Sequence, residues 1–135
     1  MTKNIVFDSY ALIAHFRKEK GHETVSELLS DIALTDKIGL ISVVNVGEIY
    51  YMLHRKFGQK AAEQSLEVVR TLPLEIVDAD LELTLAAALL KAKHKMSYAD
   101  AFAAALTQKK KGTLVTGDKE FEELCKEPNF KVRFI

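Results

Sequence analysis

Length, composition and charge describe a small globular protein. The chain has 135 residues, 48% hydrophobic and 28% charged, which fits one domain over residues 1–135. Lys and Arg total 19, as do Asp and Glu, so the net charge of zero argues against a polybasic nucleic-acid coat but not against a local basic patch. The single cysteine, Cys125, excludes an intrachain disulfide, and we expect it to be buried in a cytoplasmic protein. The apolar runs are too short for a signal peptide or a membrane helix, so no membrane association is expected.

Short apolar, β-rich runs alternate with helical periodicities along the chain. Strands are predicted over residues 5–7, 39–42, 74–77, 113–115 and 131–135. Helices are predicted between them, over residues 11–21, 23–34, 43–57, 59–71, 81–92, 98–111 and 119–126. Such alternation is typical of right-handed βαβ units. The sequence therefore predicts an α/β fold, a three-layer αβα sandwich around a mostly parallel sheet of about five strands.

Four carboxylates are predicted to meet at one edge of this sheet. Asp8 follows the first strand directly, and Asp118 follows the 113–115 strand after two residues. The carboxyl ends of parallel strands share one edge, where ligands bind in open α/β sheets. Glu48 falls in the first turns of the helix after the second strand, and Asp100 in the first turn of the 98–111 helix, whose position no local signal fixes. Carboxylate oxygens suit Mg²⁺ or Mn²⁺, so we predict a divalent metal site for phosphoryl chemistry.

Each carboxylate alone also has an ordinary structural explanation. Asp8 and Asp118 stand just before predicted helices, where Asp is a favoured N-cap. Asp100 follows Ser97 by three residues, much as in a capping box. Glu48 lies opposite the main apolar stripe of its helix, on a face that could be solvated. The argument for a metal site therefore depends on the set of four.

The segments that carry these acids resemble the motifs of PIN-domain nucleases. Residues 8–13 place an Asp-Ser pair after an apolar strand and before an apolar helix, as in the opening motif of that family. Residues 41–49, 98–106 and 114–121 are similar to its second, third and fourth acidic motifs, in the same order and at the usual spacings. The resemblance covers almost the whole chain, whose size is most similar to that of the VapC-type toxins of prokaryotic toxin–antitoxin pairs.

This resemblance implies a metal-dependent endoribonuclease, usually a homodimer, that a cognate antitoxin protein holds inactive. The acidic cluster would comprise Asp8, Glu48, Asp100 and Asp118, with Ser9 and Thr116 as supporting hydroxyls. Mg²⁺ or Mn²⁺ is expected on Asp8, Asp100 and Asp118. Glu48 is expected to hold or orient the water that attacks the RNA phosphodiester.

Two further features bear on partners. Basic residues gather in four groups, Arg17-Lys18-Lys20, Arg55-Lys56-Lys60, Lys91-Lys93-Lys95 and Lys109-Lys110-Lys111. Arg55-Lys56 and Lys109–Lys111 end helices, where cations complement the dipole. Lys91, Lys93 and Lys95 run towards Asp100 and are the favoured contacts for RNA phosphates. The 81–92 and 43–57 helices carry apolar residues on more than one face. This pattern fits burial in the core or, in line with the family habit, a dimer interface.

Two other functions remain open from the sequence. A phosphatase or phospho-acceptor domain also places an Asp after its first strand, although no second carboxylate stands two residues after Asp8. A catalytically silent RNA-binding domain would bind RNA regardless of Mg²⁺ and yield no cleavage product. Trapping a phosphoryl group on Asp8, or assaying RNA cleavage, distinguishes these functions.

Overall fold

The computed structural model describes residues 3–135, and every predicted strand and helix is present in it. In chain order the elements are β1 (Asn4–Phe7), α1 (Ser9–Arg17), α2 (His22–Leu34), β2 (Ile38–Ser42), α3 (Val43–Phe57), α4 (Gln59–Thr71), β3 (Leu74–Val77), α5 (Leu81–Lys93), α6 (Tyr98–Lys109), β4 (Thr113–Thr116), the 3₁₀ helix η1 (Lys119–Lys126) and β5 (Lys131–Phe134). No helix among these residues is both long and apolar enough to cross a membrane.

The five strands form one parallel sheet in the order β3-β2-β1-β4-β5. The first strand of the chain is therefore the central one. It pairs on one side with β2, where Val6 lies opposite Leu40, and on the other with β4, where Val6 lies opposite Leu114. The carboxyl ends of β1 and β4 consequently lie side by side, which places the residues after them at one edge of the sheet.

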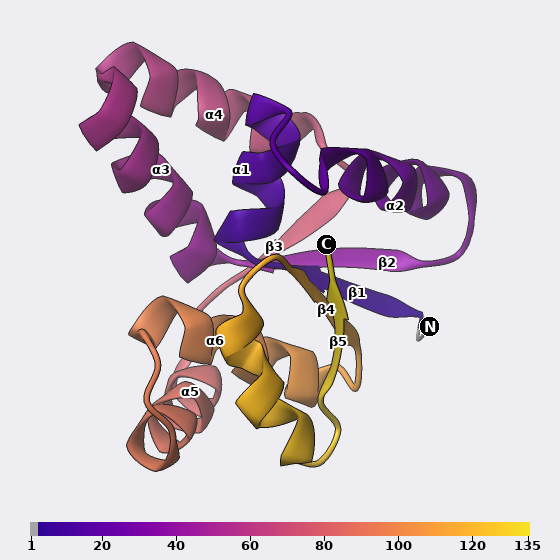
Figure 1. Cartoon of the computed structure of the whole chain (residues 1–135), viewed down its shortest axis with the longest axis vertical. Coiled ribbons are helices and arrows are strands. Elements are labelled where there is room, and N and C mark those ends of the chain that lie inside the picture. The colour runs from indigo at the N-terminus through magenta and orange to yellow at the C-terminus, as the bar shows by residue number, and fades with distance from the viewer. Residues whose placement is uncertain (1–2) are drawn as a thin grey trace.

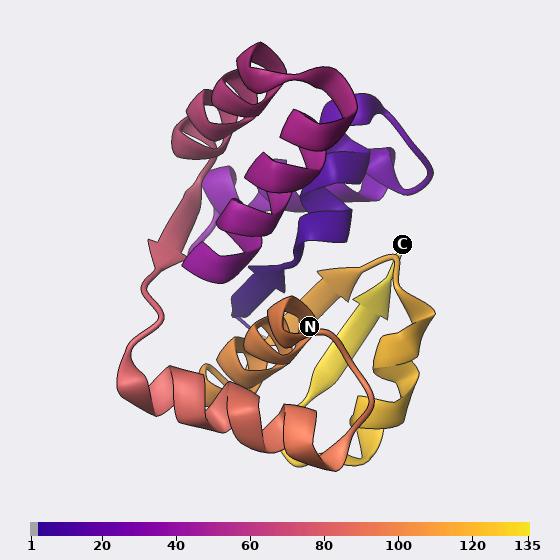
Figure 2. The same cartoon turned by 90° about the vertical axis from the view of Figure 1, so that its left-hand side faces the viewer.

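Helices cover both faces of the sheet, which confirms the three-layer αβα prediction. Figure 1 shows α1 to α4 on one side, and α5, α6 and η1 on the other. The alternation of strand side chains explains the two layers, because successive residues point to opposite faces. Ile5, Phe7 and Val115 pack into the core under α1 to α4, whereas Val6 and Leu114 pack into the core under α5, α6 and η1. Figure 2 shows the same two layers from the side.

Helix α6 is held tightly between the sheet and α5. All residues from Ala101 to Thr107 are buried, and four of the first five are alanines, which permit close packing against neighbouring backbone. The helix begins at Ser97, whose side chain accepts a hydrogen bond from the backbone N–H of Asp100 at 3.1 Å. Burial of this helix thus fixes the direction of its first turn, and with it the position of Asp100.

Four local details differ from the sequence predictions. Helix α1 ends at Arg17 and not at residue 21, because Lys18 has a left-handed φ of 53°. Helix α6 ends at Lys109 and not at Lys111, because Lys111 has a φ of 50° and the backbone turns there towards β4. The 119–126 segment is a 3₁₀ helix, and only Phe121 and Leu124 are buried along it. Cys125 is exposed, so the expectation that it is buried was wrong. It lies on the solvent side of η1, next to the buried Leu124.

Candidate active site

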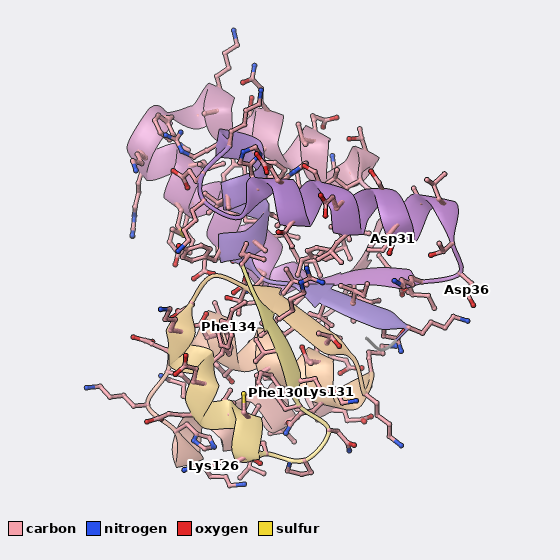
Figure 3. All side chains as sticks on the ribbon, turned by 45° about the vertical axis from the view of Figure 1, so that its right-hand side comes forward. Asp31, Asp36, Lys126, Phe130, Lys131 and Phe134 are labelled. Carbon is pink, nitrogen blue, oxygen red and sulfur yellow. The ribbon has the colours of Figure 1, made fainter. Side chains whose placement is uncertain are left out.

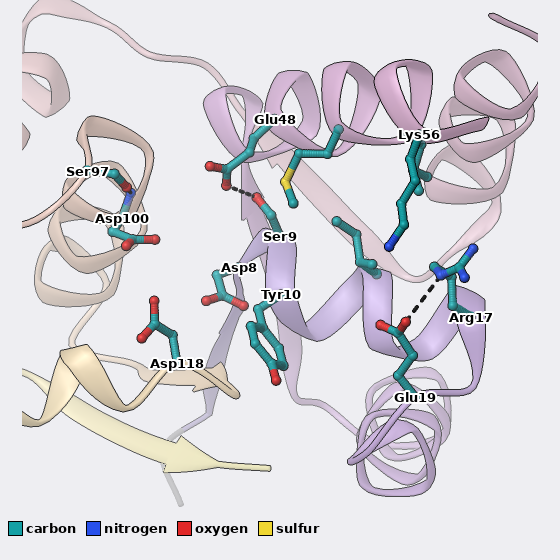
Figure 4. A pocket seen from close by; sticks show the side chains of 13 residues that line it. Asp8, Ser9, Tyr10, Arg17, Glu19, Glu48, Lys56, Ser97, Asp100 and Asp118 are labelled. Atoms are coloured by element: carbon teal, nitrogen blue, oxygen red, sulfur yellow. Dashed lines mark hydrogen bonds and ion pairs between the residues drawn. The ribbon is translucent and has the colours of Figure 1, made fainter. Parts of the chain in front are cut away.

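All four predicted carboxylates line one pocket at the carboxyl edge of the sheet. The pocket has a volume of about 400 Å³ and is lined at this end by Asp8, Glu48, Asp100 and Asp118, together with Ser9 and Ser97. Figure 4 shows the four acids converging from α1, α3, α6 and the start of η1. The pocket therefore lies where the two helical layers meet across the ends of β1 and β4.

Asp8 is the most deeply buried of these acids, with 2% of its surface exposed. It caps α1, since its Oδ1 accepts a hydrogen bond from the backbone N–H of Ala11 at 2.9 Å. The hydroxyl of Thr116 donates to its Oδ2 at 2.5 Å. Burial raises the pKa of Asp8 to about 7, against the lowering effect of these two hydrogen bonds and with smaller contributions from the charges of Asp100 and Glu48. Removal from water thus outweighs repulsion between the acids.

Ser9 and Glu48 form a pair between α1 and α3. The Ser9 hydroxyl donates a short hydrogen bond to Oε1 of Glu48. Glu48 is half-buried at the pocket wall, and Tyr51 and Met52 on the same side of α3 are 45% and 43% exposed, so the face considered solvated forms in part the wall of the pocket. The predicted supporting roles of Ser9 and Thr116 thus correspond to direct contacts: Ser9 holds Glu48, and Thr116 holds Asp8.

Asn45 is a further polar residue of the site that the sequence reasoning missed. Its side-chain amide donates to Ser9 Oγ and to the backbone carbonyl of Ala99, each at 3.3 Å. It therefore ties α3 to α1 and to the first turn of α6, next to Asp100. Its Oδ1 is buried without a hydrogen-bond partner among residues 3–135. The available signal was a lone amide inside the apolar run 43–46, one turn before Glu48.

Asp100, Asp118 and Glu120 form the closest group of acids. One carboxylate oxygen from each lies within 4.8 Å of the others. Asp118 caps η1 through a hydrogen bond from the backbone N–H of Glu120 at 2.9 Å, and its own backbone N–H donates to Thr116 Oγ1 at 3.0 Å. Glu120 was not among the predicted site residues, although it stands only two positions after Asp118. Asp8 lines the same pocket but lies outside this group, and its two oxygens accept hydrogen bonds from Ala11 and Thr116.

The electrostatics and donor chemistry of this group fit a hard divalent cation. Burial is the main cause that raises the pKa of Asp100, to about 6. The hydrogen bond with Ser97 opposes this rise, and repulsion from Asp118 and Glu48 adds to it more weakly. All the donors are carboxylate oxygens, which suit Mg²⁺ or Mn²⁺. Asp8 and Asp118 are also helix caps, so the structural explanation holds for them, whereas Ser97 and not Asp100 caps α6. Capping therefore does not account for the whole set.

The three lysines predicted to contact RNA lie outside this pocket. Lys91 donates to the backbone carbonyl of Met96 at 2.8 Å, and Lys93 pairs with Glu127 at 3.5 Å. Lys95 lines a neighbouring hollow that also contains Lys119 and Glu120. Their contact with RNA stays a prediction. The cations that do line the pocket are Arg17 and Lys56, which belong to two of the basic groups that the sequence reasoning did not favour for RNA contact.

Comparison with known proteins agrees with this arrangement. No curated protein sequence matches the chain significantly. Among solved structures, the chain is similar to VapBC2 from Rickettsia felis bound to a DNA fragment from its promoter (TM-score 0.74, 18% identity, 97% of this chain and 98% of that one). It is also similar to VapC20 from Mycobacterium tuberculosis, a toxin that cleaves the sarcin-ricin loop (0.72, 18%, 89% and 94%), and to VapBC-1 from Haemophilus influenzae (0.73, 13%, 97% and 97%).

At these identities the solved structures establish a shared fold. The sequence itself matches the family model described as PIN domain over residues 5–127, a span that includes all four predicted acids and Glu120. With the motifs, the sheet order and the acidic pocket in agreement, the chain belongs to the PIN domain family.

Proposed function

We propose that this protein is a metal-dependent endoribonuclease that hydrolyses RNA phosphodiesters, and that it is the toxin of a toxin–antitoxin pair. The observation that carries the proposal is the convergence of Asp8, Glu48, Asp100 and Asp118 from four separate elements on one pocket. Membership of the PIN domain family supports the nuclease assignment. The likeness to VapC20, described as cleaving the sarcin-ricin loop, supports RNA as the substrate class.

A Mg²⁺ or Mn²⁺ ion would be held by Asp8, Asp100 and Asp118, with Glu120 as an additional ligand from the closest group. Such an ion supplies charge neutralisation at the scissile phosphate and makes the attacking water more acidic. The protein's own contribution is positioning. Ser9 holds one oxygen of Glu48 and leaves the other to accept a proton from the attacking water, while Thr116 keeps the Asp8 carboxylate in one orientation.

We infer two protein partners. Several of the similar structures are VapBC complexes, which supports a cognate antitoxin whose C-terminal segment folds onto this protein and places an Arg or Lys among the carboxylates. The second partner is another copy of the chain. Leu81, Leu85 and Leu89 are 73%, 59% and 60% exposed and lie one turn apart on α5, an apolar stripe that suits a homodimer interface in the cytoplasm.

The structure gives less support to the two alternative functions. A phosphate-accepting aspartate must reach the phosphorus atom itself, whereas Asp8 has only 2% of its surface exposed; a small cation bound to Asp8 makes no such demand. A silent RNA-binding domain has no use for several acids in its pocket, because carboxylates repel phosphate. Both alternatives predict that purified protein with Mg²⁺ leaves RNA uncut.

The decisive experiment is an RNA cleavage assay on wild type, Asp8→Asn and Asp100→Asn, with Mg²⁺ or Mn²⁺ and with chelator. Asn keeps the shape of the side chain and much of its capping ability but loses the charge that holds a cation. Asp36→Asn is the matched control, because Asp36 lies on the far side of the molecule with 87% of its side chain exposed (Figure 3). Cleavage by wild type and the control, lost in both site variants and in chelator, is the expected result. Wild-type cleavage rates in both site variants would refute the metal-site assignment.

A further inference from the structure

The pocket that holds the carboxylates has a second end of opposite charge. Besides the acids, its wall includes Arg17 from the end of α1, Glu19 just after it and Lys56 from the last turn of α3. Figure 4 shows these three side chains together, on the side of Ser9 and Tyr10 away from Asp100. Apolar side chains line much of the remaining wall, namely Ile13, Met52 and Leu53. One cavity thus joins an acidic end to a basic end along an apolar wall.

The two cations are arranged around one aromatic ring. The Arg17 guanidinium carbon lies 4.2 Å from the centroid of the Phe57 ring, and the Lys56 ammonium nitrogen lies 5.8 Å from the same centroid. Attraction of a cation to a ring face partly compensates for holding two like charges near each other. Phe57 itself is 46% exposed, so its ring lies at the surface and is not part of the hydrophobic core.

Positive charge at this end exceeds what the neighbouring residues neutralise. Arg17 donates through Nε to Glu19 at 3.2 Å, which uses one edge of the guanidinium and leaves its terminal NH₂ groups for another acceptor. Lys56 forms no ion pair within residues 3–135. This end of the pocket therefore has two cations and one carboxylate, and the excess positive charge faces the pocket.

We propose that Arg17 and Lys56 form a subsite for a backbone phosphate that flanks the scissile phosphate of a bound RNA strand. The proposal rests on the proposed function and adds to it the path of the substrate. A nucleic-acid strand carries a charge at every nucleotide, separated by a largely apolar ribose and base. One phosphate at the acidic end, neutralised by the divalent cation, places a neighbouring phosphate further along the pocket, with the intervening nucleoside against Ile13 and Met52.

This subsite explains how a chain of zero net charge can bind RNA. The four basic groups apparent in the sequence are spread along the chain, but the fold brings only Arg17 and Lys56 into the same pocket as the acids. Contacts to phosphate position a nucleic acid without reading its bases. We therefore expect Arg17 and Lys56 to determine the affinity and register of the RNA, while the rate at which bound RNA is cleaved depends on the carboxylates.

The test combines variants of the protein with a modified substrate. Arg17→Gln and Lys56→Gln each remove one charge, and Lys126→Gln with Lys131→Gln removes two exposed charges on the η1 and β5 side of the molecule (Figure 3). Each site variant should raise KM for a short RNA by about 5-fold with kcat unchanged, as expected for a partly exposed charge contact. The control should leave KM within twofold. Melting curves verify folding, and Lys56→Gln keeps the test informative if loss of the Arg17 contact with Phe57 unfolds the protein.

Single phosphates in the RNA can be made neutral by methylphosphonate substitution around the mapped cleavage site. One flanking position should weaken wild-type binding and leave the Arg17→Gln/Lys56→Gln double variant unaffected. Binding is measured by fluorescence anisotropy in Mg²⁺, at low temperature and over times for which a parallel gel shows the RNA uncut. The double variant should also lower the slope of log K against log salt concentration by about 0.7, the value for one phosphate contact on a single strand.

The outcomes separate this subsite from its competitor and from the proposed function. If no neutral position distinguishes wild type from the double variant, the phosphate subsite is refuted. A different outcome is a double variant that keeps the wild-type KM and salt slope but is no longer inhibited by the antitoxin. Arg17 and Lys56 would then bind an acidic group of the antitoxin, and the proposal would be overturned. If wild type cuts no RNA in Mg²⁺, the proposed nuclease function fails, and the binding series alone decides the subsite.

Discussion

Burial of the Asp8 carboxylate should make the metal-free protein less stable at neutral pH than in mild acid. Its pKa is raised from 3.8 to about 7 in the folded protein, mainly by burial, so the folded state binds more protons than the unfolded chain between these two values. The contribution of Asp8 to stability therefore falls as pH rises from about 4 to 7 and is constant on either side of that range. The difference between the two pKa values corresponds to about 4 kcal/mol of unfolding free energy.

The Asp8→Asn variant isolates this effect from the other titrating groups. Asp100, whose pKa is raised to about 6, contributes in the same direction over a narrower range, whereas burial lowers the pKa of His15 and acts in the opposite sense. Both are common to wild type and variant. The difference in unfolding free energy between the two proteins should therefore change by about 4 kcal/mol between pH 4 and pH 8, with the variant relatively more stable at the higher pH.

Urea unfolding in chelator across this pH range measures the difference, and Asp36→Asn again serves as the control. Mg²⁺ or Mn²⁺ should restore the stability of wild type at pH 8, by about 2.7 kcal/mol at 100 times its dissociation constant, and should restore less in Asp8→Asn. A wild-type minus variant difference that stays constant from pH 4 to pH 8 would refute the argument from burial. Identical melting temperatures of wild type in saturating metal and in chelator would refute the metal site.

Three further predictions concern the packing around the site and the exposed stripe of α5. Asn45→Ala should lower the unfolding free energy by about 1–3 kcal/mol, because the Ala99 carbonyl loses its buried donor; an unchanged urea midpoint would count against that role. Gly117→Ala should destabilise the protein by a similar amount, about 1–3 kcal/mol, because the new Cβ would lie 2.1 Å from the Tyr10 ring. Adding Tyr10→Ala should remove this loss of stability, and a loss that persists in the double variant would contradict the clash. Leu85→Lys should shift the protein from dimer to monomer in analytical ultracentrifugation without loss of folding, whereas a dimer that survives the change would exclude the α5 stripe as its interface.

The sequence was informative wherever the signal was local. Asp8 stands directly after one strand and Asp118 shortly after another, so the topology of a parallel sheet alone predicts that they share an edge. The 3.6-residue and 2-residue periodicities predicted the helices and strands for the same reason, since each reports on only one element. The capping roles of Asp8 and Asp118 were likewise visible, because a cap involves residues two or three positions apart.

The missed residues depend on contacts between distant elements. Asn45 bonds to Ala99, and nothing in the 43–46 run indicates which helix passes there. The basic end of the pocket forms only because α1 and α3 bring Arg17 and Lys56 to the same ring of Phe57. Glu120 had a local signal, its position two residues after Asp118, but a charged side chain in a short helix is ordinarily solvated. Pairwise geometry of this kind becomes apparent only in the folded chain.

The position of β1 at the centre of the sheet sets the order in which the site can form during synthesis. The hydrogen bond from Thr116 to Asp8 joins residues 108 positions apart, so Asp8 leaves the ribosome about 5–20 s before its partner at ordinary rates of chain elongation. Until β4 arrives, β1 has β2 on one side only, and Asp118 and Glu120 do not yet exist as part of the pocket. A nascent chain therefore has no assembled site. Any activity of this pocket therefore begins only after the residues up to Glu120 have been made, and the proposed antitoxin, if translated over the same seconds, can be present when it does.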